Sequence, residues 1–251
     1  MSPFALPVEI YHAALIFLRV GAMVMLLPAI GEAAVPPMIR LAFALLLSLC
    51  LTPIAGPVLP PMPTTMGVMG GQMFKELFVG LMLGGLMQMY QAALDVAGEV
   101  MAIQTTLAFS QTANPSEAQP GSTLSSFLSL VGVALIFATN LDHLFIGAIA
   151  RSYTVFAPVK AVAVNDIGFM AVRTMGAAFA LGIQLAAPVI VFSLVLNVAT
   201  GLIGRMMPQF QIFFVVSPLS VLLGLSILML SLGSIGMVWT ERYQAFLAQF
   251  N

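Results

Sequence analysis

The chain has 251 residues, of which 61% are hydrophobic and only 7% are charged, and its formal net charge is −1. Eight Lys and Arg with nine Asp and Glu cannot cover a water-facing surface, because a soluble domain has about 25% charged residues. This composition excludes a soluble globular domain and also a disordered chain, and the lack of a basic run argues against nucleic acid as a partner. The sequence predicts an integral membrane protein, or one buried almost wholly inside an apolar assembly.

Six apolar segments follow one another along the chain, each near or above the ~20 residues that cross the apolar core of a bilayer. They lie at roughly 10–30, 38–56, 72–98, 124–150, 169–200 and 210–239. A proline-rich connector separates the second segment from the third, and residues 105–123 form the most polar stretch. The predicted fold class is therefore all-α, with about six long membrane-type helices in a single domain over 1–251.

The segments differ from ordinary lipid-facing spans. The whole chain has one Trp and four Tyr, whereas membrane interfaces usually carry belts of both residues. Arg19 and Arg173 fall within or beside apolar runs, where a charge needs a partner or a protein interior. Glycines recur in 67–71 and 80–84 at the spacing of close helix packing, without indicating which helices touch.

The third segment carries a stripe of polar side chains. Its amides and carboxylates are spaced so that they share one face of an otherwise apolar helix, and they are Gln88, Gln91, Asp95 and Glu99. One interpretation is a conduit wall or an interface with another subunit, since such a face needs water or protein donors opposite it. The other is that the two carboxylates pair with Arg19 or Arg173 inside a helical bundle. The two interpretations are compatible.

Asn140, Asp142 and His143 form the one place where a histidine lies beside a carboxylate in an apolar stretch. A proton relay is one interpretation, because histidine titrates near physiological pH, and a helix-end polar cluster is the favoured one. Two histidines and one cysteine cannot supply a zinc site. Since the signatures of nucleotide-binding loops, metalloproteases and serine hydrolases are also absent, we expect no metal, no cofactor and no enzymatic activity.

Four stretches of sequence, in the right order and at the right spacing, carry a resemblance to a known family. They are 18–21 with 27–31 and 35–40, then 97–99 with 107–110 and 114–115, then 140–143 with 152–153, and last 201–213. The match runs from about residue 11 to residue 240. It resembles the FliR family, the export-gate subunits of flagellar type III secretion, and their counterparts in virulence injectisomes. The overall likeness favours the flagellar branch.

The resemblance implies a non-enzymatic channel subunit that assembles with FliP and FliQ, and with FlhB and FlhA, in the bacterial inner membrane at the flagellar basal body. Its helices are expected to form hairpins stacked around a central conduit, through which unfolded flagellar proteins are exported. Apolar segments then face other subunits rather than lipid. The alternative function is a proton-coupled small-molecule transporter that uses Asp95, Glu99 and His143 as titrating groups.

The resemblance also implies site residues. A loop that blocks the channel is expected at 105–121, with the key positions Thr106, Leu107, Ala108, Phe109, Ser110, Asn114 and Pro115. Thr106 stands where the family commonly has glycine, Ala108 where it has serine, and Asn114 where it has aspartate. A last set is expected to hold buried charges or structural positions, and it comprises Arg19, Arg173, Asn140, His143, Arg205, Pro208 and Gln209.

Overall fold

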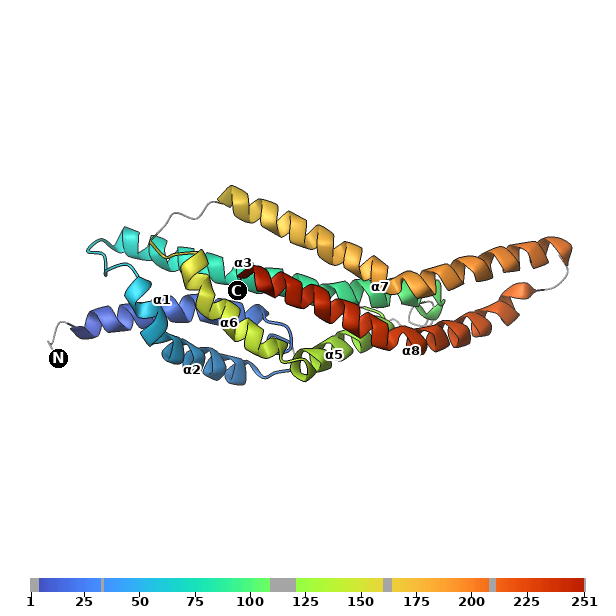
Figure 1. Cartoon of the computed structure of the whole chain (residues 1–251), viewed down its shortest axis with the longest axis horizontal. Coiled ribbons are helices and arrows are strands. Elements are labelled where there is room, and N and C mark those ends of the chain that lie inside the picture. Colours follow the sequence, from blue (N-terminus) through green and yellow to red (C-terminus); the bar gives the residue numbers. More distant parts are fainter. Residues whose placement is uncertain (1–4, 33, 109–120, 160–163, 208–210, 251) are drawn as a thin grey trace. The chain divides into compact units, whose positions relative to one another are not determined.

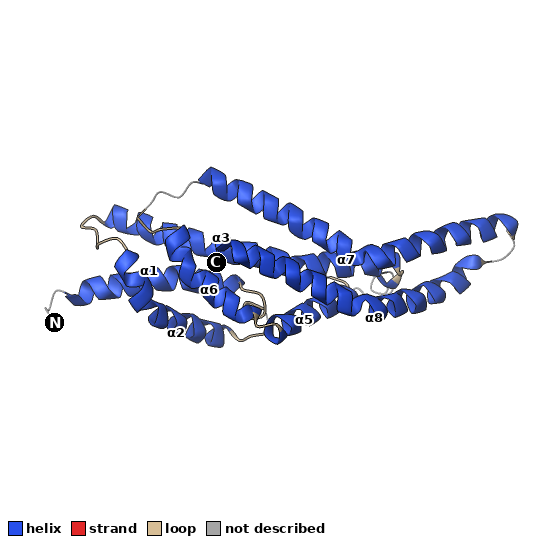
Figure 2. Cartoon of the chain, in the orientation of Figure 1, coloured by secondary structure: helices blue, strands red, loops and turns tan. Residues whose placement is uncertain are grey.

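A computed structural model describes residues 5–32, 34–108, 121–159, 164–207 and 211–250 (Figure 1). Throughout these residues the regular structure is helical, without a strand (Figure 2). The helices are α1 (Ala5–Leu26), α2 (Pro37–Ala55), α3 (Met66–Gln104), α5 (Thr123–Ala138), α6 (Leu141–Val155), α7 (Val164–Met206) and α8 (Ile212–Leu247), with 3₁₀ turns at Gly56–Val58 and Ala248–Phe250. The prediction of an all-α fold is confirmed.

Several of these helices are long and apolar enough to cross a membrane. Five pass this test alone, and they are Pro7–Leu26, Pro37–Val58, Met66–Gln104, Asn165–Met206 and Phe214–Phe250. α5 and α6 pass it only together, and they meet at a bend of 76°. The prediction of about six long apolar segments is therefore confirmed, with the fourth segment broken. Asn140 lies at the break with φ of 55°, a left-handed backbone that asparagine tolerates better than most residues.

The chain divides into two compact units. The first comprises Met1–Met89, Ile136–Met175 and Tyr243–Asn251, and the second comprises Tyr90–Leu135 and Gly176–Arg242. α3 contributes its first part to one unit and its last part to the other. The assignment of a single domain to 1–251 stays a prediction.

In the first unit, α1 and α3 run in the same direction and pack closely. A Cβ at Gly80 would collide with the carbonyl oxygen of Arg19, and one at Gly84 would lie 2.9 Å from the Cβ of Leu26. The glycines of 80–84 thus mark a helix contact, whereas those of 67–71 face open space. Buried apolar side chains of α1, α3, α6 and the C-terminal end of the chain form the core, among them Leu15, Ile16, Leu83, Leu86, Ile149 and Tyr243.

In the second unit, α7 runs in the same direction as α3, while α5 and α8 run in the opposite direction. Trp239 of α8 is fully buried, and its Nε1 donates to the carbonyl oxygen of Tyr90 on α3 at 2.9 Å. Gly182 of α7 lies directly against Ala93 of α3. Beyond these contacts α7 and α8 leave large apolar side chains exposed, among them Leu194, Val195, Val198, Leu202, Leu222, Met229 and Leu230.

Candidate functional site

The polar stripe predicted on α3 packs against α5 inside the second unit. Carboxylate and amide groups of α3 face hydroxyl and backbone groups of α5, which runs antiparallel to it. We refer to this set as the polar seam, which comprises Gln91, Asp95 and Glu99 of α3 with Ser122, Ser125 and Ser129 at and after the start of α5. Gln88, the remaining member of the predicted stripe, has an exposed side chain.

Two members of the polar seam, Gln91 and Asp95, lie in the middle of α3 and bond to α5. Gln91 is buried, and its Nε2 donates to the carbonyl oxygen of Ser129 at 2.9 Å and to the hydroxyl of the same residue at 3.2 Å. One helical turn farther along α3, the hydroxyl of Ser125 donates to Oδ1 of Asp95 at 3.3 Å. Each of these α3 side chains therefore has a partner on α5, which offsets the cost of removing it from water.

At Glu99, its remaining member on α3, the polar seam caps α5. The backbone N–H of Ser122 donates to Oε2 of Glu99 at 3.0 Å, and the Ser122 hydroxyl accepts a hydrogen bond from the backbone N–H of Ser125 at 3.1 Å. Ser122 is thus the N-cap residue of α5. The two helices approach closely here, because a Cβ at Gly98 would collide with the backbone of Ser125.

A second polar cluster lies in the first unit, around Arg19. This fully buried side chain forms two parallel hydrogen bonds with Glu76 of α3, from Nε at 2.6 Å and from Nη2 at 3.0 Å. Its remaining donors reach the carbonyl oxygens of Ser152 at 2.9 Å and of Phe156 at 3.0 Å, at the end of α6. The guanidinium carbon lies 4.3 Å from the centre of the Tyr153 ring. The cluster joins α1, α3 and α6, and the hydrogen bonds of the guanidinium make its burial tolerable.

α3 ends where the predicted loop of 105–121 begins. Thr105 donates from its hydroxyl to the carbonyl oxygen of Met101 at 2.8 Å, within the last helical turn. Thr106 then has φ of 62°, and within the described part of the chain its hydroxyl is buried without a hydrogen-bond partner. Leu107 and Ala108 follow with half-buried side chains. The other expected loop positions, Phe109, Ser110, Asn114 and Pro115, lie outside the described residues.

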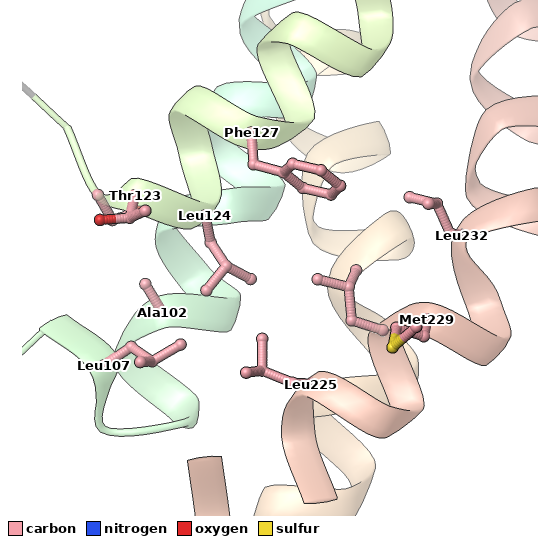
Figure 3. Close-up of a pocket in the computed structure, with 10 residues that line it drawn as sticks. Ala102, Leu107, Thr123, Leu124, Phe127, Leu225, Met229 and Leu232 are labelled. Carbon is pink, nitrogen blue, oxygen red and sulfur yellow. The ribbon is translucent and has the colours of Figure 1, made fainter. Parts of the chain in front are cut away.

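An apolar cavity of about 450 Å³ lies beside Leu107 and the start of α5, within the second unit (Figure 3). Its walls come from the end of α3, the start of α5 and the middle of α8, and they are formed by Ala102, Leu107, Ser122, Thr123, Leu124, Phe127, Leu225, Leu228, Met229 and Leu232. Figure 3 shows the side chains of Leu124 and Leu225 directed into it from opposite walls. The described lining residues carry no charge, so this part of the cavity wall suits an apolar group.

The amino-acid sequence matches the family described as bacterial export proteins, family 1, over residues 10–246. It is also 53% identical to the flagellar biosynthetic protein FliR of Caulobacter vibrioides over 250 residues, which cover 100% of each chain. The chain belongs to the FliR family of bacterial export proteins. It is 29% identical to the protein of that name from Aquifex aeolicus, over 93% of this chain and 90% of the relative. With the protein of that name from Escherichia coli it shares 28% identity, over 84% of this chain and 80% of the relative.

Three of the FliR-like stretches coincide with the polar clusters, because the pair 152–153 belongs to the Arg19 cluster. The stretch 18–21 contains Arg19, and the stretch 97–99 contains Gly98 and Glu99, which meet the start of α5. The stretch 140–143 lies at the bend between α5 and α6. The stretches at the polar clusters therefore mark places where helices of this FliR-family chain are held together.

The polar seam corrects one interpretation of the stripe. Arg19 pairs with Glu76, and neither Asp95 nor Glu99 is its partner. The reason is the order of packing along α3, whose first part lies against α1 and whose last part lies against α5. Arg173 has an exposed side chain. Contact of the stripe with a partner subunit or with the channel stays a prediction.

Most of the residues expected to hold buried charges or structural positions are exposed in this chain. Arg19 is buried, whereas the exposed members are Arg173, Asn140, His143 and Arg205. Nδ1 of His143 lies 3.2 Å from Oδ1 of Asp142, but this histidine side chain is 75% exposed. Because the exposure is that of the isolated chain, a buried or structural role for these four residues stays a prediction. Pro208 and Gln209 lie outside the described residues.

Metal-ligating side chains do not gather in the described residues. Among them, no group of three His, Cys, Asp or Glu side chains could hold a metal ion. The polar clusters consist instead of charges and amides that bond to backbone and serine groups. These hydrogen bonds hold neighbouring helices together.

Thr106 offers a test of backbone strain in this FliR-family chain. Replacing Thr106 by glycine is expected to stabilise the fold by about 1 kcal/mol, because a β-branched residue at positive φ costs more than glycine there. Loss of a buried hydroxyl without a partner acts in the same direction. The midpoint of thermal unfolding of the detergent-solubilised protein measures the effect. Thr105→Gly, in an ordinary helical turn, is the matched control and should lower the midpoint; a lower midpoint for Thr106→Gly contradicts the prediction.

Sequence reasoning does not single out Glu76, although a signal for it exists. Four positions of α3 recur every four residues and so share a face, and they are Gln72, Glu76, Gly80 and Gly84. Tyr11 of α1 donates from its hydroxyl to Gln72, so the whole face lies against α1. The glycine pair and the two polar residues before it together mark the face of α3 that partners Arg19.

Proposed function

We propose that this chain is a non-enzymatic channel subunit of the type III protein export gate. In this proposal it assembles with FliP and FliQ, and contacts FlhB and FlhA, in the bacterial inner membrane at the flagellar basal body. The gate passes unfolded flagellar proteins. The observation that carries the proposal is the 53% identity, over the full length of both chains, to a relative named flagellar biosynthetic protein FliR.

The length of the helices supports assembly with other proteins. α7 has 43 residues and α8 has 36, so at 1.5 Å per residue they are about 65 Å and 54 Å long. The apolar core of a bilayer is only about 30 Å thick. Large apolar side chains are nevertheless exposed along most of both helices, among them Phe169, Phe179, Leu194, Leu202 and Met206 on α7, and Phe214, Leu222, Met229 and Met237 on α8. Apolar surface that lipid tails cannot cover needs protein partners.

The segment 105–121 has the role of blocking the closed channel in the same proposal. Its described flanks are attached to the last turns of α3, through Thr105 to Met101 and through Ser122 to Glu99. The apolar cavity beside Leu107 lies next to these attachments. These hydrogen bonds fix both ends of the segment on α3, which supports a role at one defined place in the channel.

The alternative of a proton-coupled transporter gains no support from the surroundings of its titratable groups. Asp95 and Glu99 accept hydrogen bonds from the start and first turn of α5. His143 is exposed and paired with its neighbour Asp142. Asp95 and Glu99 thus attach α5 to α3, and the partner of His143 is its neighbour in sequence.

The proposal predicts the composition of the complex that this chain forms. A tagged copy expressed with FliP and FliQ and purified in mild detergent should elute as a large complex that contains both partners. Native mass spectrometry measures the mass, and the matched control omits FliQ from the expression. A monomer or a homodimer of this chain, recovered while both partners are present in the membrane, contradicts the export-gate assignment.

A further inference from the structure

The first turn of α5 is completed by a residue from another helix. In the usual capping box, the third residue of a helix is Glu or Gln, and its side chain accepts the backbone N–H of the N-cap residue. Here that third residue is Ser125, whose hydroxyl donates to Asp95 instead. The N-cap N–H of Ser122 therefore bonds to Glu99 of α3, at 3.0 Å. Glu99 of α3 therefore provides the carboxylate acceptor that the first turn of α5 does not contain.

α3 and α5 are closely packed around this hydrogen bond. The Ser122 hydroxyl lies 3.4 Å from the carbonyl oxygen of Gly98, and the backbone of Ser125 occupies the place where a Cβ of Gly98 would stand. A longer side chain at 98 would separate the two helices, and the Glu99 carboxylate would lose its reach. Among the described residues, Glu99 forms no ion pair with a basic side chain. Its negative charge is directed instead at the positive end of the α5 dipole.

The position of Ser122 matters because it is where the chain returns from 105–121 to the helical bundle. Ser122, Thr123 and Leu124 also form one wall of the apolar cavity, opposite Leu225 of α8. We propose that Glu99 is a positioning residue of the export gate, which fixes the start of α5 on α3 and thereby keeps the closed gate sealed. This inference rests on the proposed export-gate function.

The test uses the gate complex assembled with FliP and FliQ, and it has two readouts. The first is amide hydrogen exchange in 121–127, and the second is leakage of a small fluorescent dye from vesicles that contain the complex. In Glu99→Ala, exchange in 121–127 should become about tenfold faster, in line with the loss of a cap, while 235–243 of α8 stays protected. Dye leakage should rise in the same variant without loss of FliP or FliQ from the complex.

Two further variants separate positioning from a general loss of stability. Glu99→Gln keeps an oxygen that accepts the Ser122 N–H, so it should restore most of the protection and of the seal. Glu9→Ala removes an exposed carboxylate of α1 and should behave as the wild type. Wild-type exchange and leakage in Glu99→Ala overturn the inference.

If Glu99→Ala fails to assemble, Ser122→Pro removes the same hydrogen bond from the donor side, together with the hydroxyl that accepts the Ser125 N–H. Ser122→Ala loses only that hydroxyl and is the control for Ser122→Pro, with the same readouts. Failure of both Glu99→Ala and Ser122→Pro to give any assembled complex overturns the positioning role in favour of a purely structural one. The proposed function fails separately, because its failure appears in the wild-type chain as the absence of FliP and FliQ from the purified complex.

Discussion

Replacing Arg19 by methionine should destabilise this chain by about 3–5 kcal/mol, because the substitution leaves a buried carboxylate without its partner. Glu76 is 2% exposed and receives two of the Arg19 hydrogen bonds. The same change removes donors from the carbonyl oxygens at the end of α6. The expected result is loss of most of the protein from the membrane fraction, measured by quantitative immunoblotting, and a lower unfolding midpoint in detergent.

Two variants serve as controls for this result. Arg173→Met removes an exposed charge and should change the free energy of unfolding by no more than about 0.5 kcal/mol. Adding Glu76→Met to Arg19→Met should recover part of the loss, because a buried ion pair can often be replaced by apolar side chains of similar volume. An Arg19→Met protein as abundant and as stable as Arg173→Met shows that the cluster does not hold the helices together.

Alanine at Gly80 and alanine at Gly71 should change stability in opposite directions, although both glycines lie in α3. At Gly80 the added methyl group would collide with the backbone of Arg19, so α1 must shift, at a cost of about 1–3 kcal/mol. At Gly71 the methyl group meets nothing within 4 Å. There the better helix propensity of alanine should stabilise the fold by up to about 1 kcal/mol.

The pair is informative because intrinsic helix propensity alone predicts the same gain at both positions. Thermal unfolding of the two variants in the same detergent measures the difference. A shift of α1 at Gly80 also disturbs the Arg19 cluster, since Glu76 lies one helical turn before this glycine on the same face of α3. Equal midpoints for the two variants refute the close α1–α3 contact.

Much of the fold follows from composition and periodicity. An apolar chain with few charges must place its backbone polar groups in helices when it enters a membrane, so the helical segments are predictable from their length and hydropathy. The stripe from Gln88 to Glu99 and the glycines of 80–84 are also predictable as faces, because residues four apart lie on one side of a helix. Three of the four stripe residues and both glycines do lie at helix contacts.

The sequence by itself thus determined a membrane-type all-α chain, its FliR-like stretches and the faces on which its helices are polar or small. Only the tertiary structure decided which faces meet. Arg19 had three acidic residues of α3 as possible partners, and the direction and offset of α1 selected Glu76 over Asp95 and Glu99. The serines at the start of α5 gave no sequence signal, since a lone serine costs little on any face, yet they hydrogen-bond to Gln91, Asp95 and Glu99. Periodicity acts within one helix, whereas the choice of partner depends on how two helices cross.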